Sequence, residues 1–103
     1  MGDPMRIRAR VKGDVVEAHV LMPHPMETGF RHDDGGTLIE AHYITEIRIE
    51  AGGRPVMTAR MGIGVSADPI LTFRFRGAAK GDRIDVAWTD NRGDARTDSA
   101  IVG

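Results

Sequence analysis

The sequence has 103 residues, of which 41% are hydrophobic and 5% aromatic, so it suits one domain (residues 1–103) whose core is filled mainly by aliphatic and methionine side chains. Its 14 Lys and Arg nearly balance its 15 Asp and Glu, which argues against a dedicated nucleic-acid-binding protein because such proteins are usually strongly basic. The sequence contains no cysteine, which excludes a disulfide, a thiolate nucleophile and cysteine-based zinc or iron–sulfur sites.

The hydropathy pattern predicts neither a membrane-spanning segment nor a signal peptide. No apolar run approaches the roughly 20 residues that a helix needs to cross a bilayer. Residues 1–10, Met-Gly-Asp-Pro-Met-Arg-Ile-Arg-Ala-Arg, lack the apolar region and the cleavage site of a secretory signal. Taken alone, these features predict a soluble, cytoplasmic protein.

The first strand signal covers residues 5–12, where apolar residues alternate with basic ones. A period of two with one apolar face predicts a half-buried strand. A turn at residues 13–14 leads into a second strand signal at residues 15–22. The two segments are therefore predicted to form an antiparallel hairpin.

Further strand signals follow a long polar segment, and turns rich in Gly, Asn or Asp separate them. They cover residues 43–50, 55–61, 70–76, 83–89 and 95–102. No stretch of ten residues or more keeps a helical period. The chain is therefore predicted to be all-β, a single antiparallel β-sandwich of about seven strands.

We expect the two sheets of this sandwich to share one core. Its predicted members are Ile7, Val20, Ile47, Phe73, Val86 and Trp88. The strand that carries Trp88 is predicted to be central, and the polar final strand is predicted to lie at an edge.

Residues 21–29, Leu-Met-Pro-His-Pro-Met-Glu-Thr-Gly, open a connection of about 20 residues, longer than a compact domain normally uses. Pro23 and Pro25 restrict the backbone, so the loop is predicted to be stiff. Two interpretations remain open, because its methionines either plug one end of the core or form an exposed contact surface. In the second case, the residues that contact a partner are Met22, His24, Met26, Glu27 and Phe30.

The histidines do not follow the spacing of a metal site. They are His19, His24, His32 and His42, with no pair on one strand face. Surface histidines beside Asp and Gly are more often solvated turn residues, so we expect no specific metal. Copper is the metal that methionine and histidine on a small sandwich would suit, and a copper-binding protein that uses Met22, His24 and Met26 remains the alternative function.

No residue pattern predicts catalysis. Ser66 and Ser99 lack the context of an activated nucleophile. The adjacent carboxylates of Asp33 and Asp34 lie in a Gly-rich turn, where burial and a perturbed pKa are not expected. We therefore expect no catalytic residue and no cofactor.

Arginines recur at the outward positions of the predicted strands. They are Arg6, Arg8, Arg10, Arg48, Arg74 and Arg76. Interspersed acids make a solvated sheet face the expected state for most of them. Several arginines that converge would instead form a docking or steering surface for an anionic partner.

Several segments of the sequence resemble the SoxZ family of sulfur-oxidation proteins. They are residues 3–8 (Asp-Pro-Met-Arg-Ile-Arg), 12–17 (Lys-Gly-Asp-Val-Val-Glu), 24–29 (His-Pro-Met-Glu-Thr-Gly), 68–75 (Asp-Pro-Ile-Leu-Thr-Phe-Arg-Phe) and 88–94 (Trp-Thr-Asp-Asn-Arg-Gly-Asp). The match spans nearly the whole chain, and the string at residues 24–29 is specific enough to indicate the family and not only the fold.

The resemblance implies an immunoglobulin-like sandwich that serves as the non-catalytic half of the SoxYZ sulfur carrier in thiosulfate oxidation. In that complex, the SoxY-like partner bears a cysteine on a mobile Gly-rich arm, and other sulfur-oxidation enzymes meet the complex transiently. The composition agrees, because a chain without cysteine cannot be the covalent carrier. The resemblance also implies a periplasmic location, reached by co-export on the partner's twin-arginine signal. Neither nucleic acid nor a membrane is implied as a partner.

Overall fold

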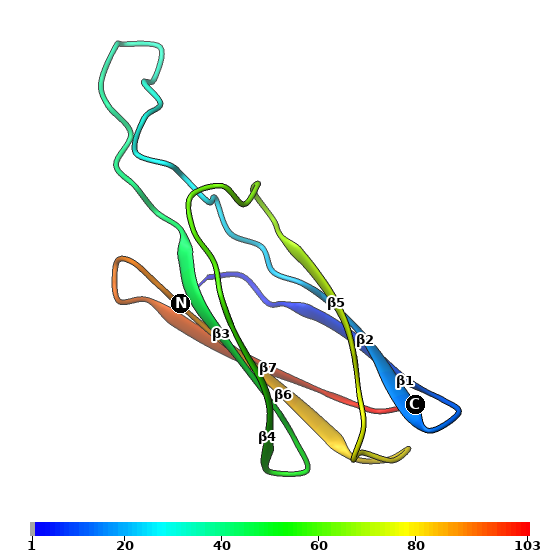
Figure 1. Ribbon diagram of the computed structural model, residues 1–103. Coiled ribbons are helices and arrows are strands. Elements are labelled where there is room, and N and C mark those ends of the chain that lie inside the picture. Colours follow the sequence, from blue (N-terminus) through cyan, green and yellow to red (C-terminus); the bar gives the residue numbers. More distant parts are fainter. Residues whose placement is uncertain (1) are drawn as a thin grey trace.

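The computed structural model describes residues 2–103, and its regular elements are all strands (Figure 1). They are β1 (Arg6–Lys12), β2 (Val15–Leu21), β3 (Ile44–Ala51), β4 (Arg54–Arg60), β5 (Ile70–Phe75), β6 (Arg83–Asp90) and β7 (Ala95–Ile101). Each begins and ends within one residue of its predicted position, so the prediction of an all-β protein is confirmed. The described residues include no helix that is long and apolar enough to cross a bilayer.

The strands form two antiparallel sheets, with the orders β1-β2-β5 and β4-β3-β6-β7. The chain crosses between the sheets after β2, returns after β4 and crosses again after β5, as in an immunoglobulin-like sandwich. β6, which carries Trp88, lies between β3 and β7, and β7 lies at an edge. Both placements confirm the prediction.

One core lies between the sheets. Val20, Ile47, Val86 and Trp88 are members of it, as predicted, and none is more than 1% exposed. Ile7 and Phe73 were also expected there but are only partly buried and pack against the core. The reason is that they belong to β1 and β5, the two edge strands of the smaller sheet, where fewer side chains cover them.

β3 does not follow the simple alternation that the sequence predicted. Ile44 and Ile47 are both fully buried because the register with β6 shifts between Ile44 and Glu46, which leaves Thr45 as an extra residue. Tyr43 and Thr45, which were expected on the same face as Ile47, are consequently only partly buried.

The connection from β2 to β3, residues 22–43, forms what we call the protruding hairpin. It extends beyond the ends of the sheets as an irregular two-armed loop (Figure 1, cyan to green). Isolated bridges join its arms at Glu27 and His42 and, further out, at His32 and Leu38. The hairpin contributes to the elongated shape of the molecule, whose principal extents are 52 × 21 × 19 Å.

Candidate functional site

The base of the protruding hairpin is part of the core. The inward alternation of β2 continues through Met22, His24 and Met26, whose exposed fractions are 0%, 4% and 5%. Of the two interpretations left open by the sequence, burial supports the first for both methionines, because they plug one end of the core. The Sδ atom of Met26 lies 3.3 Å from the backbone nitrogen of Ile44, at the start of β3.

The connection between β4 and β5 holds the first arm of the hairpin. The backbone amide of Met22 donates to the carbonyl of Pro69 at 2.9 Å. The amide of His24 donates to the Asp68 carboxylate at 3.0 Å, and the Asp68 amide donates back to the His24 carbonyl at 2.9 Å. Residues 22–24 are thus fixed although they lie outside the strands.

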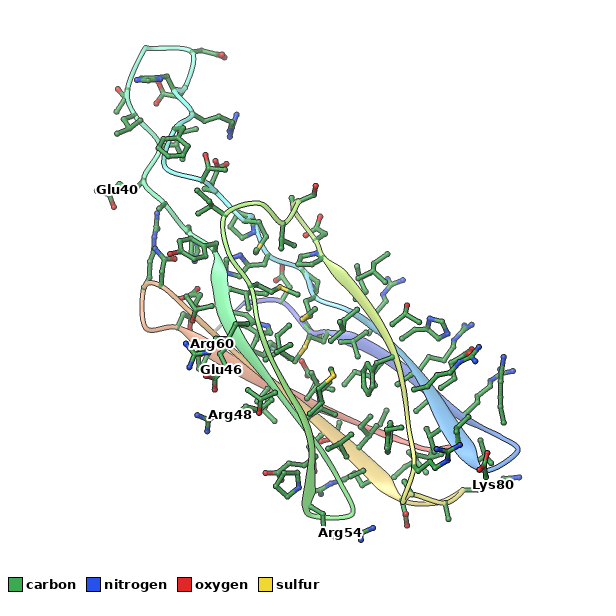
Figure 2. The ribbon with its side chains drawn as sticks, viewed as in Figure 1. Glu40, Glu46, Arg48, Arg54, Arg60 and Lys80 are labelled. Atoms are coloured by element: carbon green, nitrogen blue, oxygen red, sulfur yellow. The ribbon has the colours of Figure 1, made fainter. Side chains whose placement is uncertain are left out.

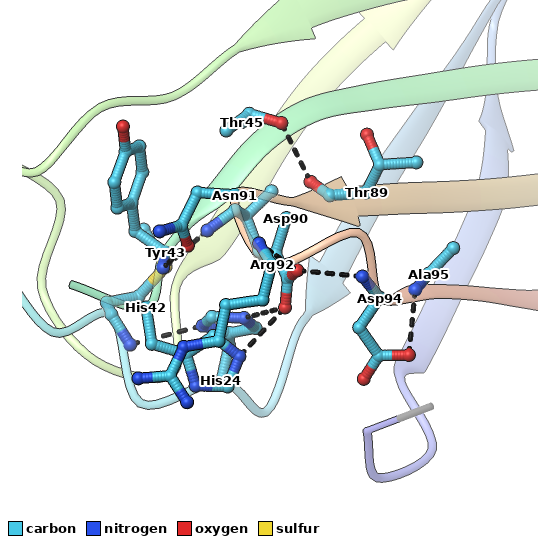
Figure 3. A network of polar contacts seen from close by, with 12 residues as sticks. His24, His42, Tyr43, Thr45, Thr89, Asp90, Asn91, Arg92, Asp94 and Ala95 are labelled. Carbon is cyan, nitrogen blue, oxygen red and sulfur yellow. Dashed lines mark hydrogen bonds and ion pairs between the residues drawn. The ribbon is translucent and has the colours of Figure 1, made fainter. Parts of the chain in front are cut away.

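His24, His42 and Asp90 form what we call the polar brace (Figure 3). Oδ2 of Asp90 accepts from Nε2 of His24 at 3.1 Å and from Nε2 of His42 at 2.8 Å. Oδ1 of Asp90 accepts from the backbone amides of Arg92 and Asp94 at 2.9 and 3.0 Å. One buried carboxylate therefore joins both arms of the hairpin to the turn after β6.

The turn after β6 also forms hydrogen bonds with the second arm of the hairpin. The side chain of Asn91 accepts from the Tyr43 amide at 2.8 Å and donates to the Ala41 carbonyl at 3.0 Å. The Arg92 guanidinium donates to the carbonyls of Ala41 and Glu40, both at 3.3 Å. Figure 3 shows these side chains directed across the turn toward the arm. The hairpin is therefore anchored on both arms.

The environment of the polar brace sets its protonation. Burial lowers the pKa of His24 below its ordinary value of 6.5, although the hydrogen bond to Asp90 opposes this effect. Burial acts to raise the pKa of Asp90, but the hydrogen bonds from His24, the Arg92 amide and His42 outweigh it and hold that pKa below its usual 3.8. At neutral pH, an ionised Asp90 thus faces a neutral His24.

The ligand atoms of His24, His42 and Asp90 lie within 4.8 Å of one another, close enough to suggest a metal ion. A metal-bound histidine carries its proton on the other ring nitrogen and donates it. Nδ1 of His24, however, accepts the Met26 amide at 3.1 Å, so the proton belongs on Nε2, which faces Asp90. The donor set fits a hydrogen-bonded brace better than a metal centre. The copper alternative is not favoured, since Met22 and Met26 lie within the core.

The outer part of the protruding hairpin carries exposed apolar side chains. Phe30 is 76% exposed, as expected, and Leu38 on the opposite arm is 52% exposed. Glu27 is half-buried and forms an ion pair of 2.6 Å with Arg31, which stiffens the arm that leads to Phe30. At the tip, the Asp33 carboxylate accepts backbone amides of the turn.

The predicted contact residues therefore fall into two groups. Met22, His24 and Met26 hold the hairpin in place from the core, whereas the half-buried Glu27 and the exposed Phe30 lie further out on the first arm. Sequence reasoning missed Leu38 and also Asp90, which lies 66 residues from His24 in the chain. The alternation of β2, continued past its end, is a signal that could have predicted the inward direction of Met22 and His24. No local signal identifies Asp90.

The six arginines predicted at outward strand positions do not lie on one surface. Arg6, Arg8, Arg10 and Arg74 lie on the outer face of the three-stranded sheet. Arg48 lies on the other sheet, and Arg76, one residue beyond β5, forms an ion pair of 3.1 Å with Asp14.

An immunoglobulin-like sandwich that presents exposed apolar side chains on an anchored hairpin is typical of proteins that work by contact with other proteins. The family comparison is more specific, because the model of "Sulphur oxidation protein SoxZ" matches residues 5–101. The chain belongs to the SoxZ family of sulfur-oxidation proteins. A comparison with curated proteins gives no match.

Proposed function

We propose that the chain is the non-catalytic subunit of a SoxYZ-type sulfur carrier and supports a SoxY-like subunit in the oxidation of thiosulfate or related sulfur compounds. Membership of the SoxZ family over residues 5–101 is the observation that carries this proposal. The sequence contributes no cysteine, so a thiol that carries sulfur intermediates has to come from the partner. Other sulfur-oxidation enzymes meet this chain transiently, through the complex.

The protruding hairpin is the proposed contact with the SoxY-like subunit. Phe30 and Leu38 expose apolar surface on a domain small enough for such surface to be an aggregation liability without a partner. The polar brace and the buried Met22 and Met26 restrict the hairpin before binding, which reduces the entropy lost on association. In this proposal, His24 and Glu27 position the hairpin, and Phe30 makes the contact.

The proposed location is the periplasm. Membership of the SoxZ family, whose SoxYZ complexes are exported, supports it. Export as a folded complex on the partner's twin-arginine signal is the proposed route.

The experiment is co-expression with a cysteine-bearing SoxY-like subunit, followed by affinity capture and native mass spectrometry. Phe30→Ser with Leu38→Ser should weaken the complex by about tenfold or more, since central apolar contacts contribute on the order of 1–2 kcal/mol each. The matched control is Ile63→Ser with Ile101→Ser, which removes exposed apolar side chains elsewhere and should leave binding unchanged.

Capture of no cysteine-bearing partner by the wild-type chain would refute the carrier role. Equal affinity of the wild-type and Phe30/Leu38 variants would refute the hairpin as the contact and leave the carrier role standing.

A further inference from the structure

The outer face of the three-stranded sheet, which we call the basic face, is rich in cations. Because side chains alternate along a strand, β1 presents a row of cations outward. This row consists of Arg6, Arg8, Arg10 and Lys12, all exposed. Arg74 of β5 lies on the same face, and the one carboxylate among the outward positions of the three strands is Glu17 of β2.

Glu17 neutralises only part of the basic face. Its carboxylate lies 3.1 Å from Nζ of Lys12 and 2.9 Å from Nη2 of Arg74. Hydrogen bonds from Lys12, His19 and Arg74 lower the pKa of Glu17 to about 2, so it stays ionised. The three arginines of the row, Arg6, Arg8 and Arg10, form no ion pair with any described residue, so none of these residues offsets their mutual repulsion.

The outer face of the other sheet has balanced charge. Arg48 lies 2.5 Å from Glu46, and Arg83 lies 3.1 Å from Asp85 (Figure 2 labels the first pair). Both carboxylates belong to the same strands as the arginines they neutralise. The excess of positive charge is therefore a local property of the basic face, because the whole chain has a net charge of −1.

The basic face is grooved, and one end of the groove is apolar. A groove of about 780 Å³ runs along the β1 row and ends at Leu21 and Ile70, of which Ile70 is 71% exposed. Arg6 pairs in register with Leu21, and Leu21 pairs with Ile70, so the apolar end lies beside the first cation of the row. Successive cations of the row are about 6.6 Å apart, twice the rise per strand residue.

We propose that the basic face docks an acidic, extended segment of a partner protein. Alternate side chains of an extended peptide have the same spacing as the arginine row, so carboxylates at every second position can face Arg6, Arg8 and Arg10. An apolar side chain at one end of the segment can cover Ile70. A single-stranded nucleic acid fits less well, because no Phe, Tyr or Trp lines the groove for its bases to stack on. This inference goes beyond the proposed function and does not depend on it.

The test measures the binding of a fluorescently labelled peptide that has Glu at alternate positions, Thr between them and Leu at one end. Anisotropy titration of the full chain should give saturable binding that weakens as salt is added. Arg8→Glu with Arg10→Glu should raise Kd about tenfold or more, because two attractive contacts become repulsive. Arg8→Gln with Arg10→Gln should raise Kd by a smaller factor and guards against a folding defect in the first variant.

The matched control is Arg48→Glu with Arg60→Glu, both labelled in Figure 2 and placed on the other sheet. It makes the same change in net charge and should bind the peptide as the wild type does. An equal loss in the control would overturn the proposal, and so would the absence of saturable binding to the wild type. Tighter binding of a labelled single-stranded oligonucleotide would identify nucleic acid as the occupant. Self-association that only the Arg8/Arg10 variants abolish would identify a second copy of the chain.

Discussion

The hydrogen bonds of Asp90 show how much of the architecture depends on one side chain. Its carboxylate accepts from two histidine rings and two backbone amides, and these donors belong to both arms of the protruding hairpin and to the turn after β6. The ring of His24 also meets the ring of Trp88 edge-on, with 5.1 Å between their centroids. A buried donor that loses its acceptor keeps the cost of desolvation, so each member of this network requires the others.

His24 should make the stability of the fold depend on pH. In the unfolded chain its pKa is near 6.5, and burial lowers the pKa in the folded protein. Below pH 6.5 the unfolded state therefore binds more protons, and the free energy of unfolding should fall as the pH falls through this window. The lowered pKa of Asp90 should add a second loss of stability below its ordinary pKa of 3.8. Urea denaturation at a series of pH values measures both effects.

Two variants isolate the contribution of His24. His24→Gln removes the titrating ring and should flatten the decline just below pH 6.5. His32→Gln, at an exposed position of the hairpin, should retain the decline of the wild type. Identical pH profiles for the two variants would show that another group causes the decline.

Among the elements, the strands were predictable because their signal is local. Alternation with a period of two is visible in any window of about six residues, and it located all seven strands. The extra residue Thr45 in β3 was not predictable, because a bulge depends on how the strand pairs with β6.

The burial of the base of the protruding hairpin could not be predicted from the local sequence. The prolines of residues 21–29 predict a stiff segment, but composition could not decide between a core plug and an exposed surface. The outcome follows from Asp68 and Asp90, which hold His24 from distant parts of the chain. Contacts between residues that are 44 and 66 positions apart leave no periodic signal in one sequence.

Two substitutions in the hairpin should have separate effects, one on stability and the other on binding. Met26→Ala removes a core side chain that is 5% exposed and should lower the free energy of unfolding by about 2–5 kcal/mol. Phe30→Ala removes a side chain that is 76% exposed, so it should leave thermal stability unchanged and weaken the SoxY-like complex. Calorimetry and an affinity measurement on the same two proteins test this. Full affinity in the Met26/Phe30 double variant would contradict a role for Phe30 in binding.

The two proposed contact regions lie on different parts of the molecule. The apolar contact is on the protruding hairpin, which the polar brace anchors to the turn after β6, whereas the basic face covers the outer side of the three-stranded sheet. Between them lies the common core, with the only tryptophan of the sequence inside it. A substitution that disrupts packing in the core should therefore weaken binding at both regions at once. A core variant thus serves as the control in each binding experiment.

Trp88 is the residue by which this core is best tested. It is 1% exposed on the interior strand β6, and its Nε1 has no hydrogen-bond partner among the described residues. Trp88→Ala should therefore lower the free energy of unfolding by about 3–5 kcal/mol, the range for deletion of a large buried aromatic side chain. Trp88→Phe should cost less, because it removes ring volume without breaking a hydrogen bond. Urea denaturation gives both values, with the exposed Phe30→Ala as the control of near-zero effect. The fluorescence of the folded wild type should be blue-shifted and should move to the red on unfolding, and an emission maximum of free indole in the folded protein would refute the burial of Trp88.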